Sequence, residues 1–158
     1  VDEYDSFVVY KNEEFEELEN FELQSYKGGD NILAYVTNRN VFKVYWECEV
    51  KELSPDVTQR YEIKYNTLMY IDERGFLNVF YQGKNHLLEY YTPQNIKMFE
   101  GIVAYTDLNG RLKAFYEGEK VDISELIIEK FDVQGRVIVF YQRNGEPNIY
   151  FDKKYFNY

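Results

Sequence analysis

The sequence predicts an all-β fold in which short antiparallel strands recur along the chain. Three observations support this prediction: an internal repeat of aromatic residues, strands with alternating apolar faces, and turn residues between those strands. Aromatic residues make up 19% of the 158 positions, which supplies enough large side chains for a core and excludes a disordered acidic tail.

The repeat has a period of 35 residues and aligns the aromatic residues in columns. Three columns are aromatic in four successive rows: Tyr35, Tyr70, Tyr105 and Phe140; Tyr45, Phe80, Phe115 and Tyr150; Trp46, Tyr81, Tyr116 and Phe151. A degenerate copy precedes them, with Lys11 in the column of Trp46. We therefore expect one domain of about 4.5 repeats, with copies at residues 1–30 (degenerate), 31–65, 66–100, 101–135 and 136–158 (partial).

Each repeat is expected to open with a strand that is apolar on both faces. These strands cover residues 32–36, 67–71, 102–106 and 137–141. Because a sheet with two apolar faces must be covered on both, we expect neighbouring repeats to pack on either side of it.

A tight turn leads from the first strand to the second. The turn begins with Asp72 and ends with Gly75 in one repeat, and Asp107 and Gly110 take these places in the next. An Asp that bonds its own turn backbone and a Gly in the left-handed region are typical of a hairpin. The second strands cover residues 42–46, 77–81, 112–116 and 147–151, and the column of Trp46 is expected to form core between repeats.

Two further strands complete the repeat. The third follows a turn at Gly83 or Gly118, or at the matching Cys48 or Lys153, and ends at Leu53, Leu88 or Ile123; the fourth, weaker one carries Tyr61, Ile96 or Phe131. Residues 12–18 also admit a capped helix, but the repeat columns favour a strand there.

A series of short meanders that cover one another's faces predicts the blades of a β-propeller-like array. The alternative is an open stack or roll of β-hairpins. The number of strands leaves open whether the array closes into a ring or is part of a longer array.

Two segments resemble a known family. The chain reads Gly-Asp-Asn-Ile-Leu-Ala-Tyr-Val at 29–36 and Val-Phe-Lys-Val-Tyr-Trp at 41–46, and residues 101–118 repeat the same unit. This unit resembles that of the short-repeat, propeller-like proteins of Gram-negative bacterial envelopes, whose function is largely unknown. The resemblance implies a non-enzymatic, periplasmic or secreted protein of the cell envelope, with an accessory subunit of an envelope or secretion complex as one expected role.

The composition excludes several classes of function. With 18 basic and 28 acidic residues the formal charge is −10, which argues against nucleic acid or an anionic membrane as the main partner. No apolar stretch approaches the roughly 18 residues that span a bilayer, so we expect no direct membrane insertion. His86 and Cys48 are the single residues of their kind, which excludes a Cys-based zinc site and an internal disulfide. We expect no metal, no cofactor and no catalytic residue.

Three features could still carry chemistry. Asp72 and Asp107 could belong to a ring of carboxylates, but Thr37 and Gln142 complete their column, so turn-forming Asp residues are expected instead. His86 is expected to lie at a strand end, and Cys48 is expected to be exposed in a turn.

Partner binding is the remaining hypothesis for function. The candidate residues are tyrosines outside the columns and an acidic run: Tyr90, Tyr91, Tyr141, Tyr155, Tyr158, Glu13, Glu14, Glu16 and Glu17. They predict a non-catalytic protein-binding or scaffolding module whose partner is an outer-membrane or secretion complex component. A lectin-like propeller that binds carbohydrate is the alternative, and an enzyme with two carboxylates 5–10 Å apart is a third hypothesis.

Overall fold

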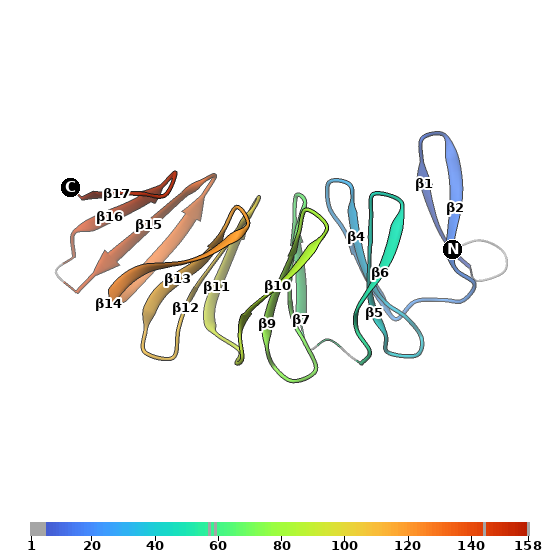
Figure 1. Cartoon of the computed structure of the whole chain (residues 1–158), viewed down its shortest axis with the longest axis horizontal. Coiled ribbons are helices and arrows are strands. Elements are labelled where there is room, and N and C mark those ends of the chain that lie inside the picture. Colours follow the sequence, from blue (N-terminus) through green and yellow to red (C-terminus); the bar gives the residue numbers. More distant parts are fainter. Residues whose placement is uncertain (1–5, 57, 59, 144, 158) are drawn as a thin grey trace.

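The computed structural model describes residues 6–56, 58, 60–143 and 145–157. In this part of the chain all regular elements are strands, seventeen in number. Every strand pairs with a neighbour in the sequence, and every pairing is antiparallel. Figure 1 shows the sheets side by side in a row, with β1 at one end and β17 at the other, so the row does not close into a ring. The described residues include no helix that could span a membrane.

The row starts with a two-stranded hairpin and continues with four meanders, which we number as blades 1 to 4. The N-terminal hairpin consists of β1 (Phe7–Lys11) and β2 (Glu14–Glu19). Blade 1 contains β3 (Ser25–Gly28), β4 (Ile32–Val36), β5 (Phe42–Trp46) and β6 (Glu49–Ser54). Blade 2 contains β7 (Arg60–Lys64), β8 (Thr67–Ile71), β9 (Leu77–Tyr81) and β10 (Lys84–Glu89).

Blades 3 and 4 share one long strand. Blade 3 contains β11 (Gln94–Phe99), β12 (Ile102–Thr106), β13 (Arg111–Tyr116) and the first half of β14 (Glu119–Gln134). The second half of β14 begins blade 4, which continues with β15 (Val137–Gln142), β16 (Pro147–Phe151) and β17 (Lys154–Asn157). Because β14 pairs with β13 and then with β15, the two blades form a single seven-stranded sheet.

The predicted all-β, propeller-like fold is confirmed. The strand favoured for the acidic segment is also present, since β2 covers Glu14–Glu19 and the helical alternative is wrong. Asn12 and Glu13 have positive φ angles of 52° and 68°, so they form the tight turn of a hairpin instead of starting a helix. The fourth segment of each sequence repeat pairs with the first strand of the next repeat, as β7 does with β8.

The turn chemistry is as predicted. Oδ1 of Asp72 accepts hydrogen bonds from the backbone N–H groups of Arg74 (3.0 Å) and Phe76 (2.9 Å). Asp107 makes the same two bonds to Asn109 (2.8 Å) and Arg111 (2.9 Å). Both aspartates are therefore turn residues, and neither belongs to a ring of carboxylates.

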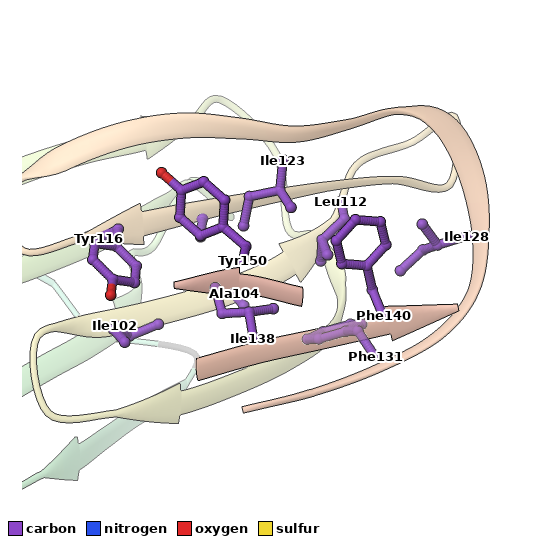
Figure 2. Packing of buried hydrophobic residues seen from close by; sticks show 11 residues of the cluster. Ile102, Ala104, Leu112, Tyr116, Ile123, Ile128, Phe131, Ile138, Phe140 and Tyr150 are labelled. Atoms are coloured by element: carbon purple, nitrogen blue, oxygen red, sulfur yellow. The ribbon is translucent and has the colours of Figure 1, made fainter. Parts of the chain in front are cut away.

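The core lies between consecutive blades. All five residues of β8 and all five of β12 are buried, as expected for strands covered on both faces. Figure 2 shows the cluster between blades 3 and 4, where Ile102 and Leu112 of blade 3 meet Ile138 and Phe140 of blade 4. Equivalent clusters lie between blades 1 and 2 and between blades 2 and 3.

One aromatic contact recurs at each boundary between blades, and we call the series the aromatic ladder. The ring centroids of Trp46 and Phe80 lie 6.2 Å apart, those of Tyr81 and Phe115 5.7 Å, and those of Tyr116 and Tyr150 5.4 Å, all edge to face. Such pairs contribute about 0.5–1.5 kcal/mol beyond their buried area.

The ladder also reaches the N-terminal hairpin. There the Lys11 ammonium lies 5.9 Å from the ring centroid of Tyr45, so a cation–π contact replaces the aromatic pair. At the next boundary, Gly83 approaches Trp46 so closely that an added Cβ would lie 2.6 Å from its ring. Glycine is required at this turn both by that contact and by its φ of 76°.

Phe151 departs from the prediction. Its column was expected to be core, and Tyr116 in the same column is fully buried, but Phe151 is 39% exposed. In the part of the chain that the structure describes, no blade follows blade 4, so the face that carries Phe151 has nothing packed on it.

The ladder predicts a specific loss of stability. Phe115→Ala should lower the free energy of unfolding by about 3–5 kcal/mol, because Phe115 is fully buried between blades 2 and 3. Urea denaturation followed by circular dichroism measures the change. Leu108→Ala is the control, since Leu108 is 74% exposed and its truncation should cost less than about 0.5 kcal/mol. Equal losses in both variants would contradict the role assigned to the ladder.

Candidate interaction surfaces

A buried polar triad joins the N-terminal hairpin to blade 1. Oε1 of Glu19 accepts a hydrogen bond from the Tyr35 hydroxyl (3.1 Å) and an ion-paired one from Lys43 Nζ (2.6 Å). The Glu19 carboxylate is almost buried, so both donors are needed to compensate its desolvation. The triad thus stabilises the packing of the N-terminal hairpin on blade 1.

The same triad recurs two blades later. Oε1 of Glu89 in blade 2 accepts a hydrogen bond from the Tyr105 hydroxyl (2.8 Å), and Lys113 Nζ lies 3.8 Å away. Lys120 Nζ approaches the same oxygen to 2.8 Å. Blades 2 and 3 are therefore joined by a charged cluster as well as by the ladder.

This geometry explains an alternation in the sequence. The column of Lys43 reads Lys43, Asn78, Lys113 and Asn148, and the column of Glu19 reads Glu19, Ser54, Glu89 and Ser124. Lysine occurs where the preceding sheet provides glutamate, and asparagine where it provides serine. The lysines of this column make contacts between blades, whereas Asn78 bonds Asp72 and the Phe76 carbonyl within its own blade. The alternation was visible in the sequence, but its match to the glutamate column was missed because the two residues lie 24 positions apart.

The enzyme hypothesis requires two neighbouring carboxylates, and Glu89 and Asp107 in this cluster are such a pair. Lys113 Nζ lies 3.8 Å from Glu89 and 3.8 Å from Asp107, so one ammonium bridges the two acids. Among the described residues no group of three or more His, Cys, Asp or Glu could hold a metal ion. The cluster accordingly supplies an ion-paired contact between blades.

The predicted acidic run lies on the N-terminal hairpin. Glu13, Glu14, Glu16 and Glu17 are all exposed. Glu16 is nevertheless engaged, since its carboxylate accepts a hydrogen bond from the Tyr45 hydroxyl of blade 1. This bond, followed by burial, raises the pKa of Tyr45.

The predicted tyrosines do not form one patch. Tyr90 and Tyr91 lie between β10 and β11, where Tyr90 is 74% exposed and packs edge to face on Phe76 at 5.3 Å. Tyr91 is half-buried, and burial, followed by the charge of Glu89, raises its pKa. Tyr141 and Tyr155 lie far along the array in blade 4, and Tyr158 falls outside the described residues.

Tyr141 and Tyr155 lie on opposite faces of blade 4. Tyr155 faces blade 3, since its hydroxyl donates to the Asp122 carbonyl (3.0 Å) and its ring packs on Tyr150 at 5.1 Å. Tyr141 alternates with the buried Phe140 and so faces away from blade 3, with Lys130 Nζ 4.4 Å from its ring centroid.

The face of blade 4 that carries Tyr141 has apolar residues on β15 and β16, with charged residues such as Lys130 and Lys154 on the strands at its edges, and we call it the C-terminal face. Its apolar residues occupy the positions that form core in the other blades: Val137, Val139, Tyr141, Pro147, Ile149, Phe151 and Phe156. Phe151 and Phe156 are 39% and 46% exposed, whereas Tyr116, the counterpart of Phe151 in blade 3, is fully buried. Of these residues the sequence singled out Tyr141 alone as a partner-binding candidate, because the repeat predicted that the other positions would be covered.

The single histidine does not lie at a strand end as expected, since His86 is the third of the six residues of β10. His86 is half-buried in β10 with its ring 4.9 Å from that of Phe115, and burial, followed by the charge of Lys84, lowers its pKa. Cys48 is exposed in the turn after β5 with a φ of 63°, and Lys11 Nζ donates to its Sγ (3.3 Å). The exposed turn expected for Cys48 is therefore confirmed.

Comparison with known proteins identifies a family. A family model described as a 10-bladed beta propeller domain matches residues 1–156. No curated protein sequence matches this chain significantly.

Solved structures with related folds share little sequence. The computationally designed Ika8 protein is 15% identical (TM-score 0.43), and the match covers 85% of this chain and 47% of that one. The N-terminal domain of Nup159 is 11% identical (TM-score 0.46), with 88% and 48% covered. Prp20p from Saccharomyces cerevisiae is 7% identical (TM-score 0.44), with 87% and 48% covered. This chain thus spans about half the length of these three proteins.

The buried triads predict a dependence on alkaline pH. Burial, followed by interaction with the neighbouring glutamate, raises the pKa of Tyr35 and of Tyr105. Above a pH of about 10 the unfolded chain loses these phenolic protons while the folded chain keeps them, so the free energy of unfolding should fall with rising pH. Each such tyrosine contributes a slope of at most about 1.4 kcal/mol per pH unit.

Urea denaturation between neutral and alkaline pH measures this slope. Tyr105→Phe should make the alkaline decrease shallower than in the wild type, since one of the retained protons is removed. A slope that is identical in the two proteins would contradict the role assigned to Tyr105.

Proposed function

Because this chain belongs to the 10-bladed β-propeller domain family, we propose that it is a non-catalytic protein-binding or scaffolding module. One observation carries the proposal, namely the exposure of the apolar C-terminal face of blade 4. The same positions form the core between the other blades, so this face has the shape and chemistry of half an interface.

The side chains on this face suit a protein partner. Phe151, Phe156 and Tyr141 are rigid aromatics that lose little conformational entropy on binding, and aromatic residues are enriched at the centres of protein interfaces. Contiguous exposed apolar patches are uncommon on monomeric soluble proteins and mark interaction sites.

We further propose that the partner lies in a bacterial cell envelope, with this chain as a periplasmic or secreted accessory subunit of an outer-membrane or secretion complex. Residues 29–46 and 101–118 support this, since they resemble the repeat unit of envelope proteins. The net charge of −10 supports a protein partner over nucleic acid.

Protein binding is better supported than carbohydrate binding. A lectin-like propeller would need equivalent polar pockets in each repeat, but Lys43 and Lys113 are ion-paired with Glu19 and Glu89. These polar positions are therefore already occupied by contacts between blades. A glycan array should show no ligand, and a sugar that binds with a dissociation constant below about 1 mM would favour the lectin alternative.

Purification of the native complex tests the protein-binding proposal. The tagged chain should be recovered with a stoichiometric protein partner identified by mass spectrometry, and Ile149→Asp should abolish recovery because it places a charge on the C-terminal face. Leu108→Asp is the control, since Leu108 is exposed and lies outside that face. Recovery of the wild-type chain alone, as a monomer, would contradict the proposal.

A further inference from the structure

The two ends of the array carry complementary halves of the contact that joins its blades. Inside the chain, the third strand of each blade presents one rung of the aromatic ladder to the next blade, as Tyr116 of β13 does to Tyr150 at 5.4 Å. Phe151 follows Tyr150 directly in β16 and faces the opposite way, so it presents the next rung from the C-terminal face.

The N-terminal hairpin carries the receiving half of this contact. Tyr10 occupies the same column as Tyr150, and Phe15 the same column as Tyr155, in each case 140 residues or four repeats earlier. The two pairs have similar ring separations, with centroids 4.9 Å apart for Tyr10 and Phe15 and 5.1 Å for Tyr150 and Tyr155.

The receiving pair is exposed on the hairpin. In blade 4, Tyr150 is 3% exposed because Tyr116 of blade 3 packs on it. On the hairpin, Tyr10 and Phe15 are 63% and 76% exposed, and among the described residues no sheet precedes them. Lys11, the next residue in β1, faces blade 1 and lies over Tyr45, so Tyr10 faces outwards.

The charges of the two ends also differ in sign. Residues 7–22 hold six acidic side chains and one basic one, a net charge of −5. Residues 128–156 hold five basic and four acidic side chains, a net charge of +1, and Lys130 and Lys154 flank the C-terminal face. The acidic hairpin is therefore attracted to the basic end and repelled by another acidic hairpin.

We propose that the C-terminal face of one copy of this chain binds the N-terminal hairpin of a second copy, with Phe151 packed on Tyr10 and Phe15 of that copy. The contact is heterologous, so it continues the row of blades from one copy into the next. It deepens the proposed function, on which it rests, by naming a second copy as the protein bound at the C-terminal face. Within the described residues two copies hold eight blades and two hairpins, which make ten units if each hairpin is counted as a blade, and the family description has ten blades.

Sedimentation equilibrium of the intact chain over a range of concentrations tests this contact. The wild type should form species of two or more chains, and higher salt should weaken them because the ends are oppositely charged. A double variant with Tyr10→Asp and Phe15→Asp should be monomeric, as should one with Phe151→Asp and Phe156→Asp. All four residues are at least 39% exposed, so both variants should keep the wild-type circular dichroism spectrum.

Mixing the two double variants supplies the decisive measurement. Each retains one intact end, so an equimolar mixture should form complexes of two chains and none larger. Leu108→Asp, outside both ends, should associate like the wild type.

Two results would overturn the proposal. One is a wild-type chain that stays monomeric at high concentration, and the other is self-association that survives in the variant altered at Tyr10 and Phe15. If the wild type is monomeric and Ile149→Asp still abolishes recovery of another protein, the second copy is wrong and the proposed function stands. If no protein binds the C-terminal face in either experiment, both proposals fail.

Discussion

The structure depends on the burial of the two blade faces that meet at each boundary. β8 and β12 are buried along their whole length and have no polar face. A single blade is therefore not stable in water, and neighbouring blades must exclude water from the boundary between them. The aromatic ladder meets this requirement with one edge-to-face contact at each boundary between blades. At the N-terminal hairpin a cation–π contact between Lys11 and Tyr45 replaces the aromatic pair. This contact helps the two-stranded acidic hairpin to pack on blade 1.

The polar contacts between blades follow the same logic. A tyrosine hydroxyl at the edge of a buried boundary needs an acceptor, and Glu19 and Glu89 supply it for Tyr35 and Tyr105. Each glutamate then needs a cation, which Lys43 and Lys113 provide. Tyr70 keeps its hydroxyl although Ser54 stands where those glutamates would, so the glutamate varies together with the lysine and not with the tyrosine.

Much of the fold could be predicted because each repeat places the same types of residue at the same positions. The first strands, which carry the column of Tyr35, were predicted to be covered on both faces, and the structure buries Tyr35, Tyr70, Tyr105 and Phe140. Asp72 and Asp107 predicted their turns because that chemistry is local. The prediction that Phe151 is a core residue was wrong. Its position in the repeat is that of a core residue, but among the described residues no blade packs on it.

The sequence by itself determined the strands, the turns and the side chains available for packing, because each depends on residues close together in the chain. The tertiary structure alone decided which faces remain uncovered, that Glu16 bonds Tyr45, and that Tyr141 and Tyr155 face opposite ways. Those outcomes depend on which blade lies next to which, and the columns of a repeat are alike at the ends of an array and in its middle. Among the described residues, exposure at either end of the row depends on whether a blade packs there, and the residues of the repeat do not encode this.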